Sequence, residues 1–359
     1  TQESNFWYLC GVEEPNWLLV LDGTRGKSWL VSPELSDVHK TFDGSLSHED
    51  AKRISGVDAV INSTELVELL RQLARVHPHV YTIGQTPHAS HYNFVLNPAI
   101  DQNRQMLDLY FTQVQDCQKE LAVLRAIKQP DELKQLHKAV AVTVAAFTMV
   151  HEKMSSYGNE FQIEADFAHS VRMSGATGCA YDSIVAAGSN ACTLHYSKNS
   201  TKIRTRQLVL MDMGALYGGY AADVSRTYAK GEPTKRQREV HGAVEAAHHR
   251  IIRLVEPMLS VESYQSSVDK IMTEALTSIG LDSDEAGRLR YFPHAISHGL
   301  GIDVHDSLGG PKYFQENMVL TVEPGIYIPE EGIGVRIEDD ILITSTGHKN
   351  LSASLSTGL

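Results

Sequence analysis

Two aspartates lie eleven residues apart in the stretch DMGALYGGYAADVSRT, which begins at residue 212. Asp212 closes the apolar run LVLMD, and Asp223 lies in a second apolar run, with a glycine-rich turn between the two. A hairpin would bring both acids side by side, where carboxylates repel each other unless they share a proton or a cation. The pair therefore indicates a paired-acid site or a metal site.

Three further polar residues interrupt apolar, glycine-containing segments: His298 in HAISHGLGIDVHD, Glu323 in TVEPGIY and Glu338 in GVRIEDD. Four carboxylates and one imidazole suit hard or borderline divalent cations such as Mn²⁺, Co²⁺, Fe²⁺ or Zn²⁺. Five protein ligands exceed what one catalytic zinc takes. Two cations roughly 3.5–4 Å apart would use them all. Taken singly, each acid is more often a satisfied structural residue, so the prediction depends on the whole set.

Composition excludes several other classes of protein. The net charge of -12, with no basic cluster, argues against a nucleic-acid partner. The longest apolar run, residues 139–150, is shorter than the roughly 20 residues of a membrane span, so we expect a buried helix and no membrane partner. Four scattered cysteines without a CxxC pair favour a reducing, cytoplasmic location. The GxSxG and phosphate-loop signatures are absent.

The 359 residues suggest two domains, with a boundary near residue 118. In the first part we expect a hairpin between residues 16–23 and 27–33, a helix at 63–76 and a buried strand at 80–84. Residues 93–110 show no clear periodicity. From residue 116 to 154 the pattern is helical, with an interruption at Pro130.

The second part is predicted to alternate helices and strands. We expect helices at 160–175, 234–255 and 260–280, and strands at 207–214, 318–328 and 334–344. This order favours an α+β domain whose helices cover one face of a curved sheet, with a pseudo-duplication of its halves as a further hypothesis. Three histidines of the 234–255 helix are interpreted as surface residues: His241, His248 and His249.

These segments resemble the pita-bread metallopeptidases, which include methionine aminopeptidase, aminopeptidase P, prolidase and the metal-free creatinase. The family pattern has Asp in D-x-G, Asp in Y-x-x-D-x-[ST]-R-T, His in H-x-x-x-H-x-x-G-x-x-x-H-D, Glu in E-P-G and Glu in R-I-E-D. The chain matches all five as Asp212, Asp223, His298, Glu323 and Glu338. The resemblance implies that these residues bind two divalent metal ions, with Mn²⁺ the first choice and Zn²⁺, Co²⁺ or Fe²⁺ as alternatives.

The resemblance also implies a fold of two domains. Residues 119–359 would form the pita-bread catalytic domain, and residues 1–118 a smaller α/β N-terminal domain like that of aminopeptidase P, whose first helix and strand would lie before Thr1. Relatives often dimerise through this domain, so we expect a homodimer or a larger homo-oligomer. Methionine aminopeptidases have no such domain.

Further residues match the Xaa-Pro peptidases of the family: His195 in TLHY, His294 and His305 around His298, and Arg336 beside Glu338. The resemblance implies that His305 stabilises the oxyanion and that Glu323 also moves a proton to the leaving prolyl nitrogen. It places His195 in the active site. It implies that His294, Tyr327 and Arg336 bind substrate, or that Arg336 fixes a ligand carboxylate.

Three functions remain open at this point. The first is an Xaa-Pro aminopeptidase acting on peptides with proline at the second position, which TLHY and YAADVSRT favour. The second is an Xaa-Pro dipeptidase, which residues 26–44 resemble more closely. The third is an inactive binding module on the same fold, against which the intact set of ligands argues. The segment between Glu323 and Glu338 lacks the insertion of many relatives, so the preferred substrate length stays open.

Overall fold

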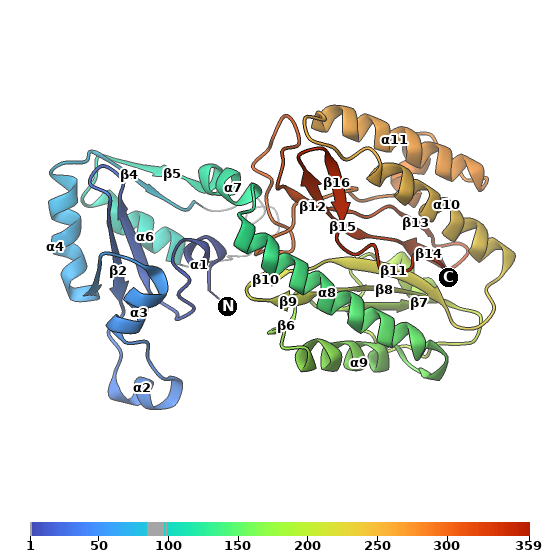
Figure 1. The fold of residues 1–359 in the computed structure, drawn as a ribbon, viewed down its shortest axis with the longest axis horizontal. Helices are drawn as coiled ribbons and strands as arrows, with labels where there is room; N and C mark the ends of the chain where they lie inside the picture. The colour runs from blue at the N-terminus through green and yellow to red at the C-terminus, as the bar shows by residue number, and fades with distance from the viewer. Residues whose placement is uncertain (1, 85–96, 98) are drawn as a thin grey trace. The chain divides into compact units, whose positions relative to one another are not determined.

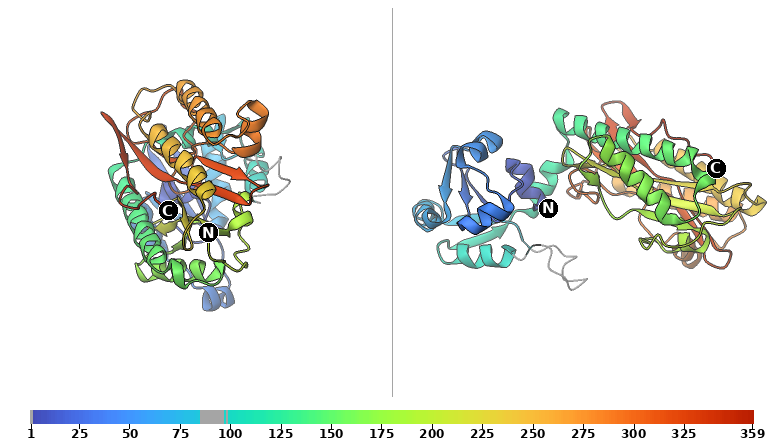
Figure 2. Two further views of the ribbon diagram at one scale, coloured as in Figure 1. Left: turned by 90° about the vertical axis from the view of Figure 1, so that its right-hand side faces the viewer. Right: turned by 90° about the horizontal axis from the view of Figure 1, so that it is seen from below.

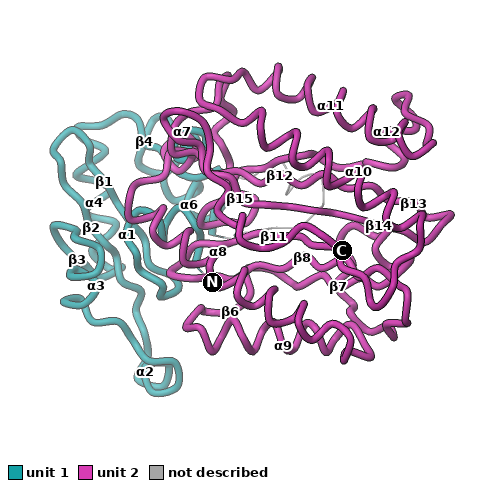
Figure 3. Tube along the Cα trace, turned by 45° about the vertical axis from the view of Figure 1, so that its right-hand side comes forward, with its two compact units in different colours: residues 1–121 teal, residues 122–359 magenta. Residues whose placement is uncertain are grey.

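The structure is a computed structural model that describes residues 2–84, 97 and 99–359. The chain forms two compact units, residues 1–121 and 122–359 (Figure 3). Within the described residues, no helix has both the length and the apolar character that crossing a membrane requires. The four cysteines are free thiols.

Unit 1 contains short helices and two small sheets. Strands β1 and β2 pair antiparallel, as the sequence predicts, while β2–β3 and β4–β5 pair parallel. The elements are α1 (Ser4–Cys10), β1 (Leu18–Asp22), β2 (Lys27–Ser32), α2 (Asp37–Asp43), α3 (His48–Ser55), β3 (Ala59–Asn62), α4 (Ser63–Ala74), β4 (His79–Thr82), α6 (Ala99–Asp108), β5 (Gln113–Asp116) and, across the unit boundary, α7 (Gln118–Ala126).

Two expectations for unit 1 need correction. Strand β4 is not buried, because it pairs with β5 alone and its residues alternate between exposed and half-buried. Within the segment expected to lack periodicity, α6 forms although only Ile100 and Leu107 of it are buried. Residues 93–96 and 98 of the same segment lie outside the described residues.

Unit 2 is built from two helix pairs and the strands between them (Figures 1 and 2). The helices are α8 (Pro130–Glu152), α9 (Glu160–Met173), α10 (Lys235–Ile252), α11 (Val261–Ser278) and α12 (Glu285–Tyr291). The strands are β6 (Gly178–Cys179), β7 (Ile184–Ala187), β8 (Leu208–Met213), β9 (Ala215–Tyr217), β10 (Tyr220–Ala221), β11 (Val224–Ala229), β12 (Val319–Val322), β13 (Gly325–Ile328), β14 (Ile333–Arg336), β15 (Asp339–Thr344) and β16 (Gly347–Asn350).

Each half of unit 2 begins with two long helices and continues with strands, and in the second half the short helix α12 comes before the strands. Helices α8 and α9 pack against each other and on β6 to β11, whereas α10 and α11 precede β12 to β16. In Figure 2 the α8–α9 pair and the α10–α11 pair lie on opposite sides of the strands. The predicted long helices are present, and this order fits the hypothesis of a pseudo-duplication.

Local sequence explains where the first long helix begins. Pro130 occupies the first turn of α8, where its missing N–H costs nothing. Gln129 and Glu132 form a capping box that satisfies two more backbone N–H groups. The apolar run 139–150 then buries one face of the helix, since Ala139, Val140 and Phe147 have no exposed surface.

The strands predicted at 318–328 and 334–344 are each divided in two. Strand β12 ends at Val322 and β13 begins at Gly325, so Glu323 and Pro324 form a break, where Pro324 has no N–H to donate to a partner strand. Strand β14 ends at Arg336 and β15 begins at Asp339, which leaves Glu338 in a second break. Both breaks coincide with acids that the sequence predicts to be metal ligands.

The interpretation of the α10 histidines as surface residues is wrong for two of the three. His241 and His248 are buried, whereas His249 is exposed. His248 lies in the core with Nε2 3.4 Å from Asp339 Oδ2. Burial lowers the pKa of the His248 imidazole to about 4, against the opposing charge of Asp339.

This histidine gives the first testable prediction. A folded-state pKa near 4, below the unfolded value of 6.5, means that stability is fully present above pH 6.5 and falls as the pH drops from 6.5 to 4. Phe at position 248 does not titrate, so the His248→Phe variant should avoid up to about 3 kcal/mol of the stability that the wild type loses between pH 6.5 and pH 4. Urea unfolding of both proteins from pH 7 to 4 measures it, with the exposed His249→Gln variant as control. Parallel pH profiles for wild type and His248→Phe would contradict the prediction.

Candidate metal centre

A tight hairpin brings the two aspartates together. Strand β8 carries Asp212, which pairs with Ser225 of β11, and Asp223 directly precedes β11. Gly214 permits this close return, since a Cβ there would lie 1.7 Å from the carbonyl oxygen of Ala222. The predicted hairpin is therefore present.

A tyrosine joins the two carboxylates. The hydroxyl oxygen of Tyr181 lies 2.6 Å from Asp212 Oδ1 and 2.5 Å from Asp223 Oδ1, so one proton is shared between two acceptors. Burial, and next the charge of Asp212, raise the pKa of this hydroxyl well above its usual value, so it stays a donor. Sequence reasoning missed Tyr181, because nothing around YDS marks it as part of a site.

Alternation along β14 and β15 directs a second group of residues to the same place. Neighbouring side chains of an extended chain point to opposite faces, so Arg336, Glu338 and Asp340 share one face and Asp339 takes the other. Ser225 donates to Glu338 Oε2 over 2.7 Å, and the backbone N–H of Asp223 donates to Asp340 Oδ2 over 3.2 Å. Asp339 instead pairs with Arg226.

Arg336 connects three parts of the site. Its Nη2 lies 2.5 Å from Asp212 Oδ2, its Nη1 donates to the Tyr327 hydroxyl over 2.9 Å, and its Nε donates to Ser225 Oγ over 2.9 Å. All three partners use the planar donor array of the guanidinium. The group is 4% exposed, so its donors face inward.

The histidine and the remaining glutamate approach from the other half of the unit. His298 Nε2 lies 3.4 Å from Asp223 Oδ2 and 3.5 Å from Glu323 Oε1. The Nδ1 atom of His298 lies 2.9 Å from the carbonyl oxygen of Gly299, which assigns the proton to Nδ1 and directs Nε2 at the carboxylates. Such a tautomer is the one that a metal-binding Nε2 requires.

The structure brings nearly all predicted site residues to one small cavity of about 80 Å³. Its lining includes the five candidate ligands and four of the five other candidates: Asp212, Asp223, His298, Glu323, Glu338, His195, His294, His305 and Arg336. Tyr327 lies behind them and contacts His294 and Arg336. Potential ligand atoms of Asp223, His298 and Glu338 lie within 4.8 Å of one another.

The electrostatics of the cavity favour a cation. Burial, and next the charge of Asp223, hold the pKa of Glu338 well above its usual value, and burial raises the pKa of Glu323 to about 7. Burial lowers the pKa of His298, but the Asp223 carboxylate outweighs it and raises the pKa to about 9. Several buried carboxylates therefore compete for too little positive charge. The donor set of oxygens and one imidazole nitrogen fits divalent metals.

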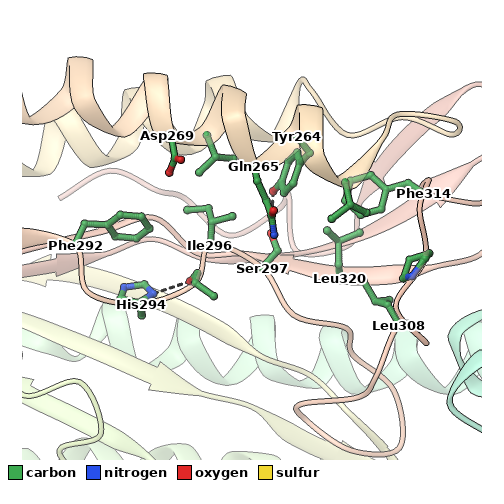
Figure 4. A pocket seen from close by; sticks show the side chains of 14 residues that line it. Tyr264, Gln265, Asp269, Phe292, His294, Ile296, Ser297, Leu308, Phe314 and Leu320 are labelled. Atoms are coloured by element: carbon green, nitrogen blue, oxygen red, sulfur yellow. Dashed lines mark hydrogen bonds between the residues drawn. The ribbon is translucent and has the colours of Figure 1, made fainter. Parts of the chain in front are cut away.

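His294 lies at the edge of a second, larger cavity of about 340 Å³ beneath α11 (Figure 4). Its ring is held edge-on by Phe292 and Tyr327, at centroid distances of 4.9 and 5.5 Å. Nδ1 lies 2.8 Å from the carbonyl oxygen of Ala295, and Nε2 lies 2.9 Å from the Tyr327 hydroxyl. Burial, and next the charge of Arg336, lower the pKa of His294 to about 4, so the ring is neutral at pH 7.

Tyr181 supports a prediction of its own. Replacing it with Phe removes the shared proton and should weaken the affinity for Mn²⁺ by about 10-fold or more, as loss of a group supporting metal ligands commonly does. Titration with Mn²⁺ after chelation measures the change. Tyr157→Phe is the matched control, because the Tyr157 hydroxyl also donates to an aspartate, Asp166, over 2.8 Å. Equal metal affinity in wild type and Tyr181→Phe would refute the prediction.

Comparisons with known proteins identify the family of the chain. Residues 134–345 match the model of metallopeptidase family M24, and residues 1–81 match the N-terminal domain of aminopeptidase P. The chain is 35% identical over 384 residues to the Xaa-Pro aminopeptidase of Escherichia coli, which covers 99% of this chain and 86% of the relative. The structure of aminopeptidase P from E. coli superimposes with a TM-score of 0.85 at 33% identity, over 99% of this chain and 87% of that one. An Xaa-Pro dipeptidase of Pyrococcus furiosus is 32% identical over 246 residues, 67% of this chain and 66% of the relative.

The chain therefore belongs to metallopeptidase family M24. Its architecture is the expected one, with a pita-bread catalytic part and a smaller N-terminal part like that of aminopeptidase P. The resemblance read from the sequence is confirmed.

Proposed function

We propose that this protein is an Xaa-Pro aminopeptidase of the aminopeptidase P type, which hydrolyses the bond between an N-terminal residue and proline. The observation that carries the proposal is the cavity where three histidines, His195, His294 and His305, surround the five candidate metal ligands. The full-length similarity to an Xaa-Pro aminopeptidase supports it, and the similarity to an Xaa-Pro dipeptidase covers less of the chain.

The proposed metal ligands are Asp212, Asp223, His298, Glu323 and Glu338, and the proposed cofactor is a pair of divalent cations with Mn²⁺ as first choice. When bound, such cations lower the pKa of a water molecule and polarise the scissile carbonyl. The chemistry of the donor set supports this assignment, and so does the excess of buried carboxylates over cations in the cavity.

Glu323 is the residue proposed to move the proton. Its carboxylate lines the cavity, with Oε1 3.5 Å from His298 Nε2, a position from which it could accept a proton from a water molecule and pass that proton to the prolyl nitrogen. His305 has its ring 4.4 Å from that of His298 and lies exposed at the edge of the cavity, a position that suits a donor to the oxyanion. Loss of the proton carrier should lower kcat.

The substrate is proposed to lie against His195 and His294. Both ring nitrogens of His294 already have partners within the chain, so we assign it an apolar packing role beside the proline ring. His195 is exposed at the rim of the cavity and is proposed to contact the peptide there. Arg336 is proposed to fix Asp212, because its donors point to the chain's own groups.

The deciding experiment compares Gly-Pro with Gly-Pro-Pro-Ala, using protein stripped by a chelator and reloaded with Mn²⁺. Cleavage of the tetrapeptide, but not of Gly-Ala-Pro-Ala at its first bond, is the expected result. Cleavage of the dipeptide alone would make the protein a dipeptidase. No cleavage of either by protein with bound metal would leave a binding module. The expected homo-oligomer and cytoplasmic location stay predictions, which sedimentation and cell fractionation test.

A further inference from the structure

A buried cluster of charges lies outside the cavity, next to one of its histidines. Asp306 accepts from two cations at once, with Arg125 Nη2 2.8 Å from Oδ1 and Lys128 Nζ 3.1 Å from Oδ2. Lys128 is 1% exposed and also donates to the Arg125 carbonyl oxygen over 2.6 Å. Arg125 pairs further with Asp303 over 2.6 Å. A side chain that left this cluster would leave a buried charge without its partner, at a large cost in free energy. This cost keeps the members of the cluster in one arrangement.

Asp306 closes the loop that carries two site histidines. It directly follows His305, and its backbone N–H donates over 2.9 Å to the carbonyl oxygen of Gly299, which directly follows His298. The loop is thus fastened at both of its ends. His305 is exposed and lines the cavity, while Asp306, the next residue, is buried.

The middle of the loop is fitted to the same cluster. A Cβ on Gly301 would lie 2.0 Å from Asp306 Oδ2 and 2.9 Å from Lys128 Nζ, so no side chain has room there. The Gly301 carbonyl oxygen accepts the backbone N–H of Ala221 over 2.8 Å, two residues before Asp223. The loop is therefore fixed both to the charged cluster and to the hairpin of candidate ligands.

We propose that Arg125 and Lys128 are positioning residues, which act through Asp306 to set the direction of the His305 ring and, with it, the donor for the oxyanion. Neither cation lines the cavity, so neither touches substrate. The kinetic test of this inference rests on the proposed function, whereas its spectroscopic test does not. A displacement of about 1 Å at a catalytic group can cost about 100-fold in rate, which sets the expected scale.

The test uses Lys128→Met, which keeps the length of the side chain and removes its charge. We expect kcat for Gly-Pro-Pro-Ala to fall about 10- to 100-fold, with KM changed less than about 3-fold. Lys153→Met is the matched control, since it breaks the exposed pair with Asp166 and should leave kcat unchanged. Should Lys128→Met fail to fold, Arg125→Lys keeps the charge and removes Nη2, the atom that contacts both Asp303 and Asp306.

A double-mutant cycle separates positioning from general destabilisation. In the His305→Ala background, Lys128→Met should lower kcat/KM less than about 2-fold further, because its effect passes through the missing ring. An equal loss in both backgrounds would overturn the proposal. Unfolding curves taken in parallel show that each variant is folded under the conditions of the assay.

A second readout needs no activity. Imidazole ¹⁵N spectra of the wild type and of Lys128→Met, assigned with His298→Gln and His305→Gln, should show shifted signals for His298 and His305. The signal of His151, whose ring stacks on that of Tyr228 with the centroids 3.9 Å apart, should not move, because none of the contacts of the charged cluster involves it. Unmoved His305 signals overturn the positioning role. Absence of peptide cleavage by wild-type protein, with His305 signals that do shift, overturns the proposed function and leaves the positioning role standing.

Discussion

Replacing Glu338 with Gln is expected to lower kcat for Gly-Pro-Pro-Ala at least about 1000-fold and to make the metal-free protein more stable at pH 7. The carboxamide keeps the shape of the side chain but is a poor ligand for a hard cation. A 1000-fold loss corresponds to about 4 kcal/mol of transition-state stabilisation, which is a reasonable share for one ligand of a metal centre.

The gain in stability follows from the raised pKa of Glu338. Burial and the neighbouring acids hold that pKa well above 4.5, so the folded protein disfavours the carboxylate. The penalty is absent below the unfolded pKa and grows as the pH rises above it. The variant should therefore exceed wild type by about 1–3 kcal/mol at pH 7 and lose this advantage near pH 4.

Urea unfolding in the presence of a chelator, at pH 7 and pH 4, measures both differences, and elemental analysis of the reloaded proteins gives the metal content. The control is Glu256→Gln, an exposed glutamate whose replacement should change neither quantity. A metal-free Glu338→Gln protein that is less stable than wild type at pH 7 would show that the carboxylate is satisfied without a cation.

The sequence could predict the candidate ligands because each acid interrupts an apolar strand, where a charge needs a partner. Asp212 lies one residue before the end of β8, whose other residues are buried, and the hairpin that brings Asp223 to it is local. The same reasoning located Glu323 and Glu338, although it made their strands continuous. The break at Glu323 coincides with Pro324, whereas Glu338 contacts Ser225, which lies 113 residues away in the sequence.

The residues that contact the candidate ligands and the loop from outside are not marked by any sequence pattern. Tyr181 reaches Asp212 and Asp223 from 31 and 42 residues away, and Lys128 reaches Asp306 from 178 residues away. An isolated tyrosine or lysine is ordinary in any segment, so its role depends on tertiary contacts. The short helices of unit 1, including α6, were missed for a related reason: each buries few residues, and the apolar periodicity that marks a helix is weak.

Replacing Arg336 with Lys is expected to lower kcat/KM about 100-fold or more and to reduce the free energy of unfolding by about 2 kcal/mol. One ammonium group cannot reach Asp212, Tyr327 and Ser225 together, as the guanidinium does. At least one buried partner then loses its hydrogen bond, at a cost of about 1–3 kcal/mol. The matched control is Arg236→Lys, which alters a two-point pair with Glu331 that is partly exposed.

The kinetics of this variant distinguish two roles that the sequence left open for Arg336. If the guanidinium fixes Asp212, metal retention and kcat fall together, and the loss is the same for Gly-Pro-Pro-Ala and for its C-terminal amide. If it binds the carboxylate at the end of the substrate, KM rises for the free peptide and the amide is spared. The 2.5 Å contact with Asp212 and the 4% exposure of Arg336 favour the first role, because each of its three guanidinium nitrogens already contacts a group of the chain. A rise in KM confined to the free acid would overturn that assignment.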